Sequence, residues 1–82
     1  MKKASPEVKK GLIEAIKTQI KDNNPPETYQ AYLRLLGQEI PEDDVYLYLA
    51  HALACEMFDM MKERKPYDQE RYIKRLAKLP DD

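Results

Sequence analysis

Residues 46–61 read YLYLAHALACEMFDMM, and this stretch decides the fold. Its apolar residues recur at the three- and four-residue spacing that is typical of a helix. Pro41 and an acidic turn at 42–44 precede it, and a basic turn at 62–65 follows it before a proline. Acids suit the positive start of a helix dipole, and bases suit its negative end. The sequence therefore predicts one long helix over 41–65.

Proline-containing breaks divide the rest of the chain into three further helices. They are expected over 6–21 with Ser5 as N-cap, over 26–36 after a break at Asn24 and with Gly37 as a left-handed end, and over 68 or 69–79 with Asp68 as cap. Two glycines, six prolines and no sustained apolar–polar alternation argue against a sheet.

The predicted fold class is therefore all-α, as a compact four-helix bundle or orthogonal helical array with helix 41–65 at its centre. A chain of 82 residues suffices for one domain. We expect that domain over 6–80, with tails at 1–5 and 81–82.

Each helix carries an apolar face that we expect to lie in the core. On the three outer helices these faces consist of Val8, Leu12, Ile13, Ile16 and Ile20; of Tyr29, Tyr32, Leu33 and Leu36; and of Tyr72, Ile73, Leu76 and Leu79. The central helix has a wider apolar arc, of roughly 180°, that includes Leu53 and Phe58. We expect both to be buried, and Phe58→Ala to unfold most of the protein. The arc exceeds what one neighbour needs, so either all three other helices pack on it or part of it meets another chain.

Three reactive side chains, His51, Cys55 and Asp59, stand one helical turn apart. His51 falls at the edge of the apolar arc, and the other two lie further round the helix. A thiolate with a nearby cation, or a metal site, is one interpretation. However, structural zinc needs four ligands, and the chain has one histidine and one cysteine. No glycine-rich turn is near to supply an oxyanion donor. We therefore expect a boundary histidine, a small apolar cysteine and a solvated aspartate, with no cofactor, no metal and no catalysis.

Charge is segregated along the sequence. Residues 1–21 carry six lysines and two glutamates, whereas 22–59 carry eight acids and one arginine. In the last helix Arg71, Lys74, Arg75 and Lys78 form one basic band. This band and the basic first helix suggest an accessory protein that binds nucleic acid phosphates. Alternatively, the band pairs with the acidic middle of the chain, within one monomer or between two, or is simply solvated.

The order of NNPPETYQAYLRLLG, IPEDDVYLYL, CEMFDMMKERKPYD and RYIKRLAKLP from Asn23 onward resembles small stand-alone helical proteins of bacteria. The resemblance implies an all-α fold and attaches no activity to any residue.

The sequence predicts a non-catalytic module for protein–protein interaction or self-association, with a homodimer as one form. Nucleic-acid binding is the alternative, and a thiol or metal site at His51 and Cys55 is the third. Tyrosines suit interfaces because one end is apolar and the other polar, so Tyr46 and Tyr48 join the four basic residues as candidate interaction residues. One cysteine and no apolar run long enough for a bilayer predict a soluble, cytoplasmic protein with no membrane partner.

Overall fold

The structure is a computed structural model in which residues 6–80 are described. The two predicted tails and the Ser5 cap lie outside these residues. The described chain forms four helices: α1 (Pro6–Asp22), α2 (Pro26–Gly37), α3 (Glu42–Glu63) and α4 (Gln69–Lys78). The all-α prediction is confirmed.

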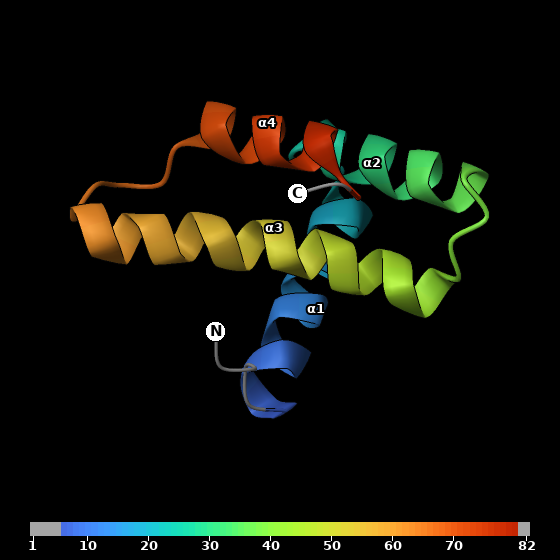
Figure 1. Ribbon diagram of the computed structural model, residues 1–82, viewed down its shortest axis with the longest axis horizontal. Coiled ribbons are helices and arrows are strands. Elements are labelled where there is room, and N and C mark those ends of the chain that lie inside the picture. Colours follow the sequence, from blue (N-terminus) through green and yellow to red (C-terminus); the bar gives the residue numbers. More distant parts are fainter. Residues whose placement is uncertain (1–5, 81–82) are drawn as a thin grey trace.

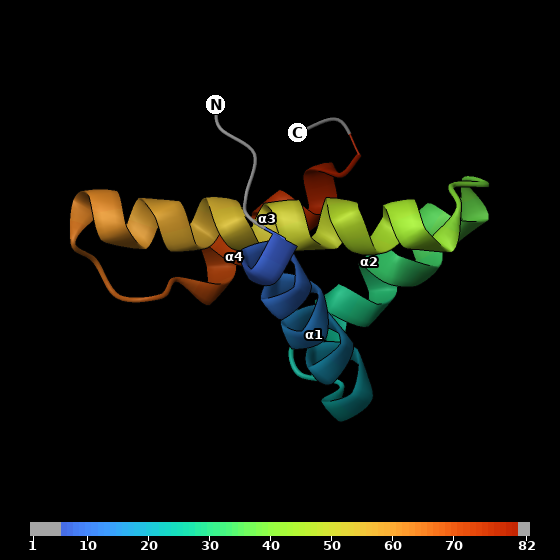
Figure 2. The same cartoon turned by 90° about the horizontal axis from the view of Figure 1, so that it is seen from below.

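The long helix α3 is the central element, as predicted, because each of the other helices packs on it. Its 22 residues run along the longest dimension of the molecule, 36 Å. Helix α4 returns beside α3 in the opposite direction, α2 lies next to α4, and α1 crosses α3 at a steep angle (Figures 1 and 2). The arrangement is therefore closer to an array of crossing helices than to a parallel bundle.

The helix ends follow the breakers, with small corrections. Helix α1 ends at Asp22, one residue beyond the predicted Lys21, and Asn23 takes a left-handed φ of 51°, which asparagine tolerates better than most residues. Gly37 is not left-handed: it is the last residue of α2, and Glu39 takes the positive φ of 64° instead. Arg64, with a φ of 53°, ends α3 before the predicted Lys65.

Helix α4 is secured at both ends. The Asp68 side chain accepts a hydrogen bond from the backbone N–H of Arg71 at 3.1 Å, which confirms the predicted cap. At the other end Arg34 of α2 donates to the carbonyl oxygens of Leu79 at 2.7 Å and Leu76 at 2.8 Å. The last carbonyls of a helix lack their usual partners four residues on, and Leu76 otherwise accepts from the Leu79 N–H at 3.3 Å. Arg34 therefore supplies donors to both carbonyls and ties α2 to α4.

The core lies where all four helices meet, and its apolar members are Ile16, Ala31, Leu35, Val45, Leu49, Ala50, Ala52, Tyr72, Leu76 and Leu79. It also encloses a polar contact: the hydroxyls of Tyr72 and Thr28 both donate to the Gln19 side-chain oxygen, at 2.9 and 2.7 Å. Buried hydroxyls are costly unless they are hydrogen-bonded. One glutamine of α1 therefore satisfies one residue of α4 and one of α2.

The predicted core faces of α1 and α4 are largely confirmed, although Val8 of α1 is exposed. The face predicted for α2 is wrong in part, because Tyr29 and Leu33 are exposed while Thr28 and Leu35 are buried. In a helix that carries leucines on several sides, the side that packs is decided by the neighbouring helices and not by the helix alone.

The buried face predicted for α3 is the largest correction. Phe58 is 61% exposed, and Leu53 is only half-buried at the edge of the core. The residues buried opposite Phe58 are Val45, Leu49, Ala52 and Glu56. The other three helices cover that opposite side, so part of the wide apolar arc is left outside the core.

Candidate interaction surface

A row of apolar side chains on α3 lies outside the core, and we call it the α3 strip: the exposed Leu47, Met57, Phe58 and Met61, with the half-buried Ala54 among them. The exposed fractions of its large members are 37% for Leu47, 47% for Met57, 61% for Phe58 and 78% for Met61. Spacings of three, four and seven residues place them on one side of the helix. Single exposed apolar residues are ordinary, but a contiguous row is a candidate interaction surface.

A hollow of about 540 Å³ lies on α3 where the strip begins, and Asp44, Leu47, Tyr48 and His51 line it. Leu47 and the ring of Tyr48 give it an apolar wall, and the Asp44 carboxylate gives it an acidic rim. Such an apolar pocket with one polar edge suits an apolar or aromatic side chain that has a cation beside it.

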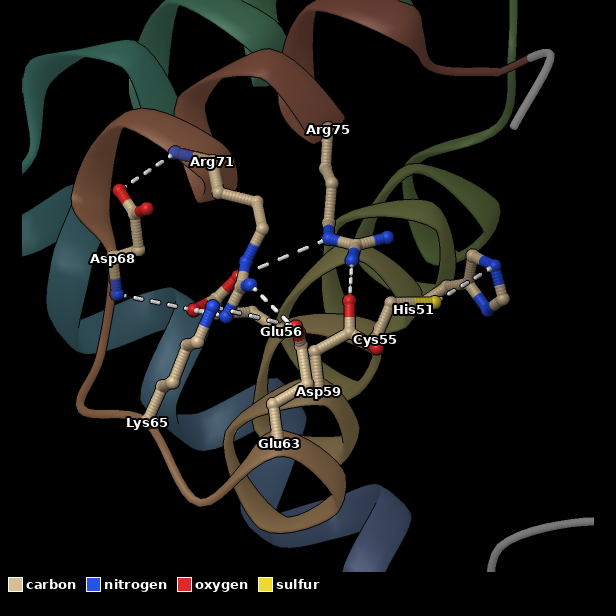
Figure 3. A network of polar contacts seen from close by, with 9 residues as sticks. All are labelled: His51, Cys55, Glu56, Asp59, Glu63, Lys65, Asp68, Arg71 and Arg75. Carbon is tan, nitrogen blue, oxygen red and sulfur yellow. Dashed lines mark hydrogen bonds and ion pairs between the residues drawn. The ribbon is translucent and has the colours of Figure 1, made fainter.

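A row along α3 is formed by His51, Cys55 and Asp59, and Figure 3 shows the polar contacts that each side chain makes. The Cys55 Sγ lies 3.5 Å from the His51 Nε2. Asp59 instead pairs with Arg75 of α4. Within residues 6–80, no group of three or more potential ligands is placed to hold a metal ion. His51 and Cys55 therefore contact each other, whereas Asp59 belongs to a separate cluster of ion pairs between α3 and α4.

That set centres on Glu56, a carboxylate with no exposed surface. Arg71 reaches it from α4 with two hydrogen bonds, from Nε at 2.7 Å and from Nη2 at 3.0 Å (Figure 3). The backbone N–H of Asp68 donates a third at 3.1 Å. Arg71 also donates to Glu63 at 3.1 Å. A buried charge requires such pairing, and this forked geometry is the strong form of the arginine–carboxylate contact.

Arg75 completes the cluster that joins α3 to α4. It pairs with Asp59, and its Nε lies 3.9 Å from a Glu56 oxygen. The hydrogen bonds from Arg71 hold the pKa of Glu56 below its ordinary value, although burial acts in the opposite direction. Glu56 therefore stays ionised and fixes how α4 lies on α3.

The burial of Glu56 was not predicted from the sequence. A signal was present: acids at 56, 59 and 63 and arginines at 71 and 75 share helical spacing on two helices joined by a short loop. The structure thus places Arg71 and Arg75 in pairs within one monomer. Lys74 and Lys78 of the predicted band point to solvent.

Tyr46 and Tyr48, the two candidate aromatic residues, lie on different sides of α3 and are both half-buried. The Tyr46 ring lies 5.6 Å from that of Tyr32, with the Lys17 ammonium 5.4 Å above it. Tyr32 donates to Glu42 at 2.6 Å, and this bond raises the pKa of Tyr32. Tyr46 therefore belongs to an internal aromatic contact, whereas Tyr48 lines the hollow.

No protein-family model matches the chain, and neither a curated protein nor a solved structure matches it. In residues 6–80, none of the helices has the length and apolar character needed to cross a membrane. The surface of these four helices is therefore the basis for a proposed function of the protein.

Proposed function

We propose that the protein is a non-catalytic self-association module whose α3 strip binds a second copy of the chain. The exposure of the strip carries the proposal: three of its side chains, Met57, Phe58 and Met61, are about half exposed or more and adjoin one another on one helix face. Covering apolar surface is the main favourable contribution to most protein association.

The charges at the two ends of α3 favour a second copy as the occupant. The first turn of α3 carries exposed Asp43 and Asp44, and its last turn carries exposed Lys62. Neither Asp44 nor Lys62 takes part in an ion pair with another described residue. A surface that carries both signs at opposite ends of an apolar row is complementary to itself when one copy is reversed.

Nucleic-acid binding is less well supported, because Arg71 and Arg75 already pair with acids of α3. Lys74 and Lys78 are the members of the band left for phosphates. Binding to phosphates weakens steeply with salt, whereas apolar association does not. A cytoplasmic location, in a bacterium as the resemblance suggests, fits a chain whose single cysteine forms no internal disulfide.

Sedimentation of the purified protein across a range of concentrations tests the proposal. The wild-type mass should rise from one chain to two with concentration and should remain concentration-dependent at high salt. Phe58→Asp should hold the protein at the monomer mass, because a charge cannot be buried in an apolar contact without a partner. Leu33→Asp makes the same change at a 49% exposed leucine of α2, outside the strip, and serves as the control.

Two results would overturn the proposal. One is a wild-type mass of a single chain at every concentration. The other is a dimer that Phe58→Asp leaves intact. A monomer that binds labelled duplex DNA with a steep salt dependence would favour the nucleic-acid alternative instead.

A further inference from the structure

From the hollow and the charges along α3 we infer that two copies pair through antiparallel α3 helices, with a two-fold axis close to Ala54 and with Phe58 of each copy seated in the hollow of the other. The inference rests on the proposed self-association and adds its orientation, its register and the residues that meet.

The register follows from the positions of the apolar groups around Ala54. Leu47 and Met61 each lie seven residues from it, on opposite sides along the helix. In an antiparallel pair centred on Ala54, Leu47 of one copy therefore opposes Met61 of the other. Ala54 opposes itself, and its small side chain lets the two helices approach closely. The apolar strip then covers itself over its whole length.

The hollow provides an independent observation for the same register. Leu47 and His51, which line it, lie on either side of the position four residues before Ala54, and Phe58 lies four residues after Ala54. At about 100° per residue, Phe58 also projects from α3 in a direction between those of Leu47 and His51. A two-fold axis that lies in the interface, perpendicular to the helices, maps each side of the α3 strip of one copy onto the same side of the α3 strip of the second copy. It therefore brings the exposed Phe58 ring over the hollow.

The charges select the antiparallel orientation. Asp44 on the rim of the hollow and Lys62 project from the same flank of α3, at nearly equal distances on opposite sides of Ala54. In the antiparallel pair Asp44 of each copy meets Lys62 of the other, so the charged contact forms twice. In a parallel pair the acidic starts would oppose each other, and so would the basic ends, which is unfavourable.

Site-specific cross-linking tests the arrangement in a Cys55→Ser background, which removes the native thiol. With a short bis-maleimide reagent, Ala54→Cys should cross-link to its own kind. Leu47→Cys and Met61→Cys should each react poorly alone but should cross-link when the two variants are mixed. If Leu47→Cys and Met61→Cys each cross-link efficiently to themselves, the helices are parallel and the inference is wrong.

A charge exchange provides a second test that does not depend on new cysteines. Lys62→Glu should weaken dimerisation roughly tenfold, because two contacts become repulsive. Adding Asp44→Lys to the same chain should restore most of the affinity. Lys78→Glu makes the same charge change at an exposed lysine of α4, outside the α3 strip, and should have little effect on dimerisation. A dimer that Lys62→Glu weakens but Asp44→Lys fails to rescue contradicts the register and leaves the proposed self-association standing, whereas a wild-type monomer contradicts both.

Discussion

Leu49→Ala should unfold much of the protein, whereas Phe58→Ala should leave the stability of the monomer almost unchanged. Leu49 is fully buried, and removing such a leucine costs about 2–5 kcal/mol. The total stability of a small domain is near the lower end of about 5–15 kcal/mol. Phe58 is 61% exposed, and such surface substitutions usually change stability by about 0.5 kcal/mol or less.

Chemical denaturation at a concentration where the chain is monomeric measures both effects. Both substitutions place an alanine in α3, so the difference between their effects reflects which side of the helix loses its side chain. If Phe58→Ala were as destabilising as Leu49→Ala, Phe58 would belong to the core, and the strip would not be a free surface.

Arg71→Met should destabilise the protein strongly and reverse its response to mild acid. The substitution keeps much of the apolar length of the side chain but leaves the buried Glu56 carboxylate without its main partner. Removing one member of a buried ion pair is strongly destabilising because the other charge stays buried. We expect the melting temperature to fall by about 10 °C or more.

The pH dependence follows from the pKa of Glu56. In the wild type this pKa is lowered, so the pair contributes stability above the unfolded pKa of about 4.3, and this is lost as pH falls through the folded value. Without Arg71, burial is the largest remaining influence on the pKa of Glu56, and only the Asp68 N–H and Arg75 still oppose it. We therefore expect this pKa to rise above the unfolded value, so that protonation of Glu56 stabilises the fold as pH falls toward the raised pKa. Thermal melts between neutral pH and about pH 3 compare the two proteins, because the wild-type loss lies below the unfolded pKa.

Lys74→Met is the matched control for Arg71→Met, since Lys74 lies on the exposed side of the same helix. It should change the melting temperature by only a few degrees at most and keep the wild-type pH profile. An Arg71→Met protein that is as stable as the Lys74→Met protein would show that Glu56 does not need its arginine.

The helix boundaries could largely be predicted from the sequence because the residues that determine them act locally. Prolines, the acidic start of α3 and the Asp68 cap each act within a few residues of where they stand. The faces of α1 and α4 were mostly readable as well, because polar residues leave each of these helices essentially one apolar side.

Neither the buried side of α3 nor the burial of Glu56 could be predicted from the sequence. Alanine, leucine, methionine and aromatic residues surround most of α3, so hydrophobicity alone does not distinguish the core side from the strip. The actual core side contains a glutamate, which a hydrophobic criterion places outside. Its burial is favourable because Arg71 and Arg75 approach it from α4 and the Asp68 N–H donates to it, and these contacts are a property of the tertiary arrangement.

The α3 strip, with Met61 on it, should be exposed in one chain and covered in two, and methionine oxidation distinguishes these two states. Met61 is 78% exposed in the single chain, and oxidation by dilute peroxide follows exposure. Its rate, measured by mass spectrometry of the peptides, should be high in dilute protein and should fall several-fold at concentrations where the mass doubles. In Phe58→Asp it should stay high at both concentrations. A wild-type dimer in which Met61 is oxidised as fast as in the monomer would show that the α3 strip is not the interface.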